Sequence, residues 1–308
     1  MRTWPAIRIR WTATLLLVTA AIPPLAGPNT RSNEKLQAAT ERALSGRSGA
    51  LVVVDVQSSE ILAAHDLRLA ATALARPGST VKPFVLRALL ETGKVDAEER
   101  LICRRVLRIG GVQMDCSHPA AVVSVNAKEA LAYSCNSYFA EVATRLTAEE
   151  LVAELKRAGL DAPSGLVKQE ATGKIRKPGT REALQLEGLG DRGIEVTPLE
   201  LLGAYRRLAL EKRSGNPGKD KAVFEGLEES VVYGMAHAVN LNEMKIAGKT
   251  GTAASRESSG THGFFVGYAP AEAPEIAIVV YLAEGRGSDA AAAARSVLAE
   301  FAAGRPTP

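Results

Sequence analysis

Segments that read as β-strands lie near both ends of this chain, and segments that read as helices fill its middle. Two strand-like runs come early, at residues 49–56 and 60–64, and three come late, at 245–252, 262–268 and 275–282. Too many helical segments occur in a row between them for each helix to connect two adjacent strands. The pattern therefore predicts an α+β fold, with a mainly antiparallel five-stranded sheet built from both ends of the chain and an inserted all-α subdomain.

Helices at the two ends of the chain are expected to cover one face of this sheet. One is predicted at residues 34–45 and the other, rich in alanine, at 288–303. The helical subdomain is expected over roughly residues 80–240, with irregular or loop-rich stretches at 95–125 and 160–196. Three of its helix starts combine an N-cap residue with a glutamate three positions later, and these N-caps are Asn126, Thr147 and Thr197.

The first 26 residues have the pattern of a secretory signal. Arginines precede a short apolar run at residues 11–22, and small residues follow it up to Ala26. The run is shorter than the about 20 residues that span a membrane. We therefore predict a signal peptide or an N-terminal membrane anchor over residues 1–26 and one domain over 27–308. The protein is expected to be exported, in the periplasm or on the extracytoplasmic face of the inner membrane.

The positive net charge of +4 gives little support to nucleic-acid binding. Three of the basic residues lie in the predicted signal, and the remaining chain has no basic stripe interleaved with aromatic residues. We expect no nucleic-acid partner, and contact with a membrane only through an N-terminal segment that is not removed.

Three cysteines in an exported chain allow one disulfide and leave one thiol. Cys103 and Cys116 enclose a loop-like segment and are the predicted pair, whereas Cys135 reads as a small buried residue in a helical context. Zinc binding by Cys103, Cys116 and His118 is the alternative. Because this spacing fits no standard zinc site and no fourth ligand is evident, we expect neither a metal nor a cofactor.

A serine and a lysine lie one helical turn apart where an apolar helix begins. Ser79 follows a Pro-Gly turn, and Lys82 comes three residues later on the same face. The free N–H groups and the positive dipole end of a helix start suit a nucleophile whose reaction creates an oxyanion. None of the four histidines lies beside an acid as in a catalytic triad, so Lys82 is the predicted base for Ser79.

A second lysine occurs in a strand context, in the motif Lys249-Thr250-Gly251-Thr252. The ammonium and the two hydroxyl groups would form a carboxylate-binding surface on the strand edge. Gly251 is expected to leave room for a substrate backbone to lie against the strand. The charge of Lys249 would also help to keep Lys82 neutral, as a general base requires.

A third motif, Ser134-x-Asn136, lies between two predicted helices. Its hydroxyl and carboxamide groups are suited to relaying a proton and holding a substrate amide. Single motifs are weak evidence, since similar ones recur at residues 32–35 and 124–126. The ordered set Ser-x-x-Lys, Ser-x-Asn and Lys-Thr-Gly is, however, typical of penicillin-binding proteins and serine β-lactamases.

With its flanking segments, this set resembles the transpeptidase domain of penicillin-binding proteins, and class B most closely. The resemblance covers most of residues 48–300 and includes the opening strands and the closing segment up to Pro270. Class B proteins usually carry a large N-terminal pedestal. Only residues 27–48 separate the predicted signal from the first strand here, so we expect neither a pedestal nor a glycosyltransferase domain.

The resemblance implies a serine-type D,D-transpeptidase that acts on the D-Ala-D-Ala end of peptidoglycan stem peptides and is acylated by β-lactams at Ser79. Lys82 would be the base, and Ser134 would relay protons. The backbone N–H groups of Ser79 and Thr252 would form the oxyanion hole. Substrate binding would fall to Asn136, Lys249, Thr250, Gly251 and Thr252. Proteins of cell-wall synthesis are the partners that this resemblance suggests.

Other functions use the same motifs. A serine β-lactamase or a D,D-carboxypeptidase would form the same acyl-enzyme, but the class A β-lactamase pattern Glu-x-x-Leu-Asn is missing, and residues 182–186 are the nearest run. A non-catalytic β-lactam sensor or scaffold is less favoured. An inactive scaffold should have lost Ser79, Lys82 or Lys249, and all three are present.

Overall fold

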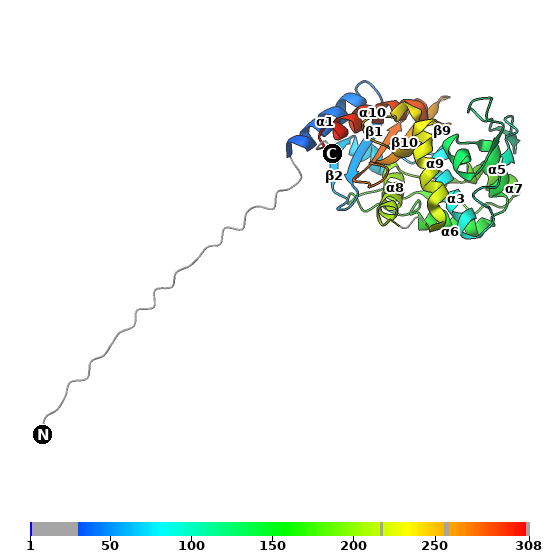
Figure 1. The fold of residues 1–308 in the computed structure, drawn as a ribbon, viewed down its shortest axis with the longest axis horizontal. Coiled ribbons are helices and arrows are strands. Elements are labelled where there is room, and N and C mark those ends of the chain that lie inside the picture. The colour runs from blue at the N-terminus through cyan, green and yellow to red at the C-terminus, as the bar shows by residue number, and fades with distance from the viewer. Residues whose placement is uncertain (2–29, 216–217, 256–258, 306–308) are drawn as a thin grey trace.

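The computed structural model describes Met1 and residues 30–215, 218–255 and 259–305. Apart from Met1, the signal peptide or anchor predicted over residues 1–26 lies outside this part of the chain. No helix within the described ranges is both long and apolar enough to cross a membrane. The chain forms an α+β structure in which a sheet and a group of helices lie side by side (Figure 1).

The predicted five-stranded antiparallel sheet is confirmed, with strand order β2-β1-β11-β10-β9. Its strands are β1 (Gly49–Asp55), β2 (Ile61–His65), β9 (Ala247–Ala254), β10 (Thr261–Ala269) and β11 (Ile276–Leu282). Strand β1 pairs with β11 in a register that sets Val52 opposite Val279. The two ends of the sequence therefore meet in the middle of one sheet, and β9 forms one of its edges.

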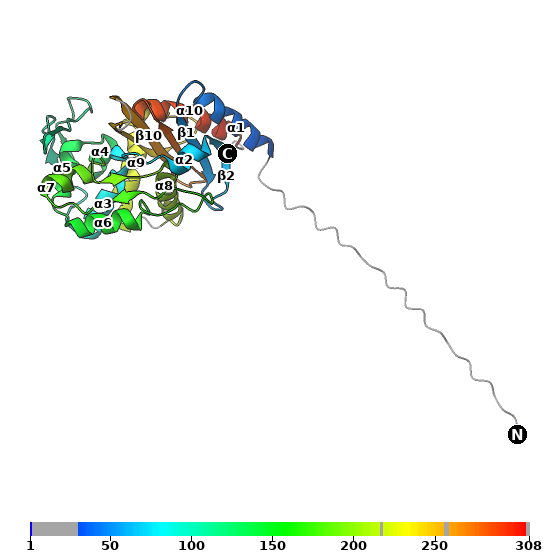
Figure 2. The same ribbon diagram turned by 180° about the vertical axis from the view of Figure 1, so that it is seen from behind.

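Both faces of the sheet are covered, because its central strands carry apolar side chains on both sides. Leu51 and Val53 pack with α1 (Thr30–Ala43) and α10 (Gly287–Ala303), the predicted terminal helices, which lie together on one face (Figure 1). The alternate residues of β1 point the other way and join a larger core that includes α8 (Pro198–Arg213). Figure 2 shows α2 (Leu67–Thr72) and α8 on this second face.

Most of the remaining helices lie beyond the β9 edge of the sheet (Figures 1 and 2). These helices are α3 (Lys82–Glu91), α4 (Ala127–Ala132), α5 (Asn136–Ala143), α6 (Ala148–Arg157), α7 (Arg181–Gly188) and α9 (Lys221–Val232). The 3₁₀ turns are η1 (Gly78–Val81), η2 (Gly218–Asp220) and η3 (His237–Val239). Short strand pairs are β3 (Leu101–Ile102) with β6 (Ser124–Val125), β4 (Arg108–Ile109) with β5 (Val112–Gln113), and β7 (Lys174–Ile175) with β8 (Ile194–Glu195).

Helix α7 corrects the expectation that residues 160–196 are loop-rich. It begins after Thr180, whose side chain accepts a hydrogen bond from Ala183 N, and it buries Leu184 and Leu186. With a length of only eight residues, it spans too few turns for an apolar period to stand out in the sequence.

The three predicted capping boxes at Asn126, Thr147 and Thr197 are confirmed. The third one is buried, and its Glu200 also accepts a hydrogen bond from Gly173 N at 2.7 Å. This cap starts α8, whose Tyr205 hydroxyl donates to Thr80 O at 2.8 Å. Helix α8 therefore holds the turn η1 in position through a buried hydrogen bond.

Replacing Thr197 with alanine should destabilise the protein more than replacing Thr147, although both remove the same kind of cap. The exposed Thr147→Ala change should cost about 1 kcal/mol of unfolding free energy. Thr197→Ala leaves the buried Glu200 N–H without a partner and should cost about 2–3 kcal/mol. Urea unfolding followed by circular dichroism measures both values, and equal costs would contradict the buried role of this cap.

Candidate active site

Ser79 lies on the turn η1, directly before α3. Residues three apart are aligned in a 3₁₀ turn, so Ser79 and Lys82 share one side of the chain. Gly78 has a φ of +54°, in the left-handed region that favours glycine, and its N–H donates to Gly190 O at 3.0 Å. Ser79 is partly exposed and Lys82 is fully buried, so the predicted nucleophile is accessible while its predicted base is shielded.

The ammonium group of Lys82 joins the first predicted motif to the second. Its Nζ donates to Ser134 O at 2.8 Å, to Ser134 Oγ at 3.2 Å and to Asn136 Oδ1 at 2.6 Å. Burial lowers the pKa of Lys82 to about 8, against a smaller opposing effect of Cys135 and Cys116. Lys82 therefore meets the condition for a general base near neutral pH.

The second motif is held in a special backbone conformation. Ser134 lies between α4 and α5 with a φ of +52°, which is uncommon for a residue other than glycine. Asn136 starts α5, and its Nδ2 donates to Met114 O at 3.1 Å and Asp115 O at 3.2 Å. Both ends of the Asn136 amide thus have protein partners, and this side chain links Lys82 to the segment at residues 114–115.

Lys249 from the third motif is buried next to the other two. Its Nζ donates to Thr250 O at 3.1 Å. Burial first, and then the positive charge of Lys82, lower the pKa of Lys249 well below its usual range. The positive charge of Lys82 thus disfavours the charged form of Lys249, and the predicted effect of Lys249 on Lys82 stays a prediction.

The strand β9 packs tightly against the turn η1. A Cβ atom at Gly251 would lie 2.4 Å from Pro77 O and 2.9 Å from Thr80 Cγ2. The turn therefore occupies the space toward which a side chain at Gly251 would point, and the room for a substrate backbone along this strand stays a prediction. On the other side of this contact, a Cβ atom at Gly78 would lie 3.0 Å from Thr252 N. This close approach places the third motif beside the turn that carries Ser79, the predicted nucleophile.

The two threonines of the third motif differ in accessibility. Thr250 is buried, and its Oγ1 donates to Met235 O at 3.4 Å. Thr252 is exposed, and its Oγ1 accepts a hydrogen bond from Gly287 N at 2.9 Å. Thr252 is therefore the hydroxyl group of this pair that a bound ligand could reach.

The predicted disulfide between Cys103 and Cys116 is not formed. Both residues and Cys135 are free, and the Cys103 and Cys116 sulfur atoms lie 3.5 Å apart, compared with about 2.05 Å in a disulfide. Cys116 Sγ also lies 3.8 Å from Cys135 Sγ, so it contacts two thiols rather than one. Cys135 is buried, as expected, but the sequence analysis did not place it with the other cysteines.

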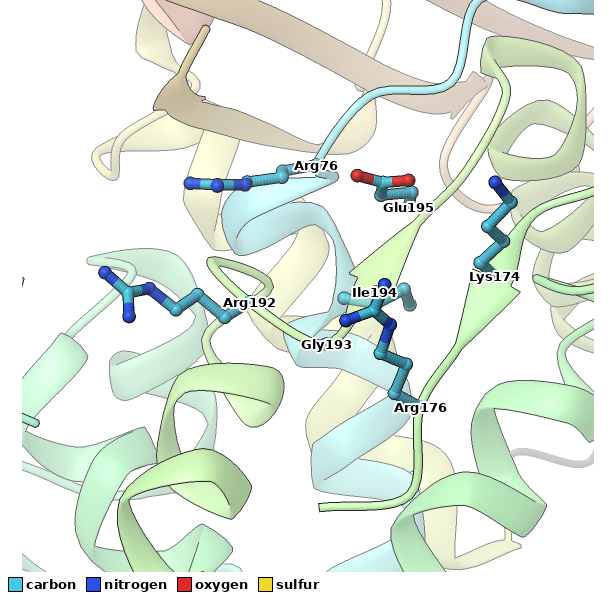
Figure 3. A pocket seen from close by; sticks show the side chains of 7 residues that line it. All are labelled: Arg76, Lys174, Arg176, Arg192, Gly193, Ile194 and Glu195. Carbon is cyan, nitrogen blue, oxygen red and sulfur yellow. The ribbon is translucent and has the colours of Figure 1, made fainter. Parts of the chain in front are cut away.

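A basic cavity of about 340 Å³ lies next to the segment that leads into η1, and the sequence did not predict it. Figure 3 shows its lining residues, which are Arg76, Lys174, Arg176, Arg192, Gly193, Ile194 and Glu195. The basic side chains come from three segments, and only the fold gathers them. The hydrogen bond from Gly78 N to Gly190 O ties one of these segments to η1.

Comparison with known proteins agrees with this geometry. The family model "Penicillin binding protein transpeptidase domain" matches residues 49–302. The chain is 26% identical over 348 residues to the peptidoglycan D,D-transpeptidase MrdA of Acinetobacter baumannii, covering 85% of this chain and 52% of that protein. It is 25% identical over 299 residues to the peptidoglycan D,D-transpeptidase FtsI of Escherichia coli, covering 81% and 50%. The chain thus spans about half the length of these relatives.

Solved structures share the fold. Pseudomonas aeruginosa PBP2 superimposes with a TM-score of 0.76 at 24% identity, over 87% of this chain and 76% of that one. The transpeptidase domain of Burkholderia pseudomallei penicillin-binding protein 3 has a TM-score of 0.77 at 20% identity, over 89% and 97%. Since the family model covers most of the sequence, the predicted resemblance is confirmed, and this chain belongs to the family of penicillin-binding protein transpeptidase domains.

Proposed function

We propose that this protein is a D,D-transpeptidase that acts on the D-Ala-D-Ala end of peptidoglycan stem peptides through an acyl-enzyme at Ser79. The observation that carries this proposal is the hydrogen bonding of the buried Lys82 to Ser134 and Asn136, one turn away from Ser79. The activity named for the relatives MrdA and FtsI supports the substrate class.

The paired lysines supply a base when the substrate arrives. A terminal carboxylate beside Lys249 would raise the pKa of Lys249 and keep its ammonium group charged. That charge would disfavour a proton on Lys82. The burial of Lys82 already lowers its pKa to about 8. The neutral Lys82 amine then accepts the Ser79 proton, so substrate binding itself prepares the base.

The reaction then proceeds in two transfers. Ser79 Oγ attacks the carbonyl carbon of the penultimate D-Ala, while the backbone N–H groups of Ser79 and Thr252 stabilise the oxyanion, which is typically worth about 3–4 kcal/mol. The C–N bond to the terminal D-Ala breaks, and the leaving amine receives a proton through Ser134, which contacts Lys82. An amine of a second stem peptide then attacks the ester carbonyl and the bond to Ser79 Oγ breaks. The proton that the amine loses passes through Lys82 to Ser79 Oγ, and the new amide bond is the cross-link.

The basic cavity is suited to the acidic groups of a stem peptide. Four basic side chains and one acidic side chain line it, so its surroundings carry an excess of positive charge. Arg76, one of the lining residues in Figure 3, lies only three residues before Ser79, so the cavity adjoins the segment that carries the proposed nucleophile. We assign it to carboxylate groups of the donor or the acceptor peptide.

The substrate also argues for an extracytoplasmic location. Peptidoglycan is cross-linked outside the cytoplasm, and residues 1–26 have the pattern of a signal peptide or anchor. We therefore place the domain at residues 27–308 in the periplasm or on the outer face of the inner membrane.

Hydrolysis of β-lactams is the competing activity, and it needs a base that activates water. Glu187 on α7 is a buried carboxyl group. Its burial raises its pKa to about 8. This group is protonated at neutral pH and is a poor base there. The class A pattern Glu-x-x-Leu-Asn is also missing, with residues 182–186 as the nearest run, and this absence favours a long-lived β-lactam adduct over rapid turnover.

Purified protein incubated with a stem-peptide donor and an amine acceptor should release D-Ala and form a cross-linked product, both detected by mass spectrometry. Ser79→Ala should abolish both products, because no acyl-enzyme forms, and the exposed Ser296→Ala should have no effect. Release of D-Ala with only the hydrolysed donor would instead identify a carboxypeptidase. Rapid turnover of a chromogenic cephalosporin would identify a β-lactamase.

The rate of acylation by penicillin should rise with pH and level off above pH 8. The folded-state pKa of Lys82 is lowered to about 8, and only its neutral form accepts a proton, so the active fraction grows about tenfold per pH unit below that value. Stopped-flow labelling between about pH 6 and 10 measures this profile. A rate constant that stays flat or falls over this range would exclude Lys82 as the base.

Removing a basic side chain from the cavity should weaken binding of acidic donor peptides. Arg176→Ala or Arg192→Ala should each cost about 1 kcal/mol, or roughly a fivefold rise in KM, with little change in kcat. The KM for donors with amidated carboxylates should not change in these variants. The control variant Arg42→Ala on α1 should leave the KM for acidic donors unchanged. Equal effects on acidic and amidated donors would argue against the assignment.

A further inference from the structure

His262 contacts the chain segment that leads to Ser79, and the proposed mechanism gives this histidine no role. It lies on β10, beside the strand β9 that holds the third motif, and only 3% of it is exposed. Its Nε2 lies 2.7 Å from the backbone oxygen of Arg76, three residues before Ser79. A side chain 186 positions away from Arg76 thus reaches the backbone next to the proposed nucleophile.

This hydrogen bond determines the tautomer of His262. A backbone carbonyl group only accepts hydrogen bonds, so Nε2 carries the ring proton and donates it to Arg76 O. Burial lowers the pKa of His262 below its usual range, against a smaller opposing effect of this hydrogen bond, so the ring is neutral at neutral pH. The one N–H group of the neutral ring is therefore used to hold the segment before Ser79.

Two aromatic neighbours fix the orientation of the His262 ring. The Phe264 ring meets it at 88° with a centroid distance of 5.8 Å, and the Tyr281 ring lies 5.9 Å away. The rings of Phe264 and Tyr281 also contact each other, with centroids 4.8 Å apart. Packing of this kind locks a side chain in one rotamer, as a group that positions others requires. The donor for Arg76 O is therefore a fixed point of the sheet.

The other anchors of this segment leave one stretch without support. Flanking residues are held by distant parts of the chain, through the pairs Ala75–Val196, Gly78–Gly190 and Thr80–Tyr205. Pro77 has no N–H group, and its oxygen accepts from Thr80 inside the turn. Among the described residues, the hydrogen bond from His262 is therefore the one that ties positions 76–77 to another element.

We propose that His262 is a positioning residue for the nucleophile, because its Nε2–H group fixes the Arg76 carbonyl and with it the path of the chain into the turn that carries Ser79. Reaction requires a precise distance between Ser79 Oγ and the scissile carbonyl, and a displacement of about 1 Å can cost about 100-fold in rate. His262 itself takes no part in the bond changes. This inference rests on the proposed function, in which Ser79 forms an acyl-enzyme.

Substitutions at position 262 separate the hydrogen bond from the packing. A glutamine amide places an N–H group about where Nε2 lies, and the shorter asparagine does not reach Arg76 O. We expect His262→Phe and His262→Asn to slow the acylation step of fluorescent penicillin about tenfold or more, and His262→Gln to stay within about threefold of the wild type. The Kd of the complex before acylation should not change, since the proposed carboxylate contacts of Lys249 and Thr252 lie on β9.

The acylation rate constant and Kd are obtained by stopped-flow labelling over a range of penicillin concentrations. Equal rate constants in the Gln, Asn and Phe variants, whether lowered or not, would overturn the proposal, and so would a loss confined to Kd. His65→Phe, on the opposite edge strand β2, is the matched control and should keep the wild-type rate. Failure of the proposed function is distinguishable, because the wild type itself would then remain unlabelled at Ser79.

The tautomer of His262 can be measured in the wild type, which tests the proposal even where the Phe and Asn variants fail to fold. Ring ¹⁵N chemical shifts at neutral pH should show a protonated Nε2 and an unprotonated Nδ1. Loss of one signal set in His262→Gln identifies this residue among the four histidines. A proton on Nδ1 in place of Nε2 would overturn the proposal, because Nε2 could then donate nothing to Arg76 O.

Discussion

The buried ammonium group of Lys82 is the interaction on which this site depends. An ammonium group that is buried away from water needs hydrogen-bond acceptors in the protein. The acceptors of Lys82 are the backbone and hydroxyl oxygens of Ser134 and the amide oxygen of Asn136. Three hydrogen bonds therefore connect the start of α3 to the junction of α4 and α5. The same burial that makes these bonds necessary lowers the pKa of Lys82 into the range of a general base. The burial of Lys82 is therefore the cause both of its hydrogen bonds to the second motif and of its lowered pKa.

A second constraint is the close contact between β9 and the turn η1. Glycines at positions 78 and 251 allow the strand and the turn to approach to distances that any side chain would prevent. This contact sets Lys249 and Thr252 beside the turn that carries Ser79. It also makes β9, an edge strand of the sheet, part of the site, because the turn packs directly against this strand.

The environment of the second motif extends this picture outward. Asn136 reaches the backbone at residues 114–115 with its amide, and Cys135 reaches the same segment with its thiol. The basic cavity is lined in part by Arg76, which lies three residues before Ser79 in the chain. Residues far apart in sequence thus contact the same groups around Lys82, and the effects of their substitutions on activity should not be independent.

Local patterns in the sequence determined the elements and the three motifs. β-Branched runs at both ends, N-cap residues and the Ser79–Lys82 spacing depend on interactions between near neighbours, and these predict the five strands, the capping boxes and the family. The sequence did not predict helix α7, because this helix is too short to show a helical period of apolar residues. Only the tertiary structure decided how distant groups meet: that the space beside Gly251 is filled by η1, that Cys135 joins Cys103, Cys116 and His118, and that basic residues from 76 to 192 line one cavity. Such contacts depend on the packing of whole elements, which no local spacing along the chain records.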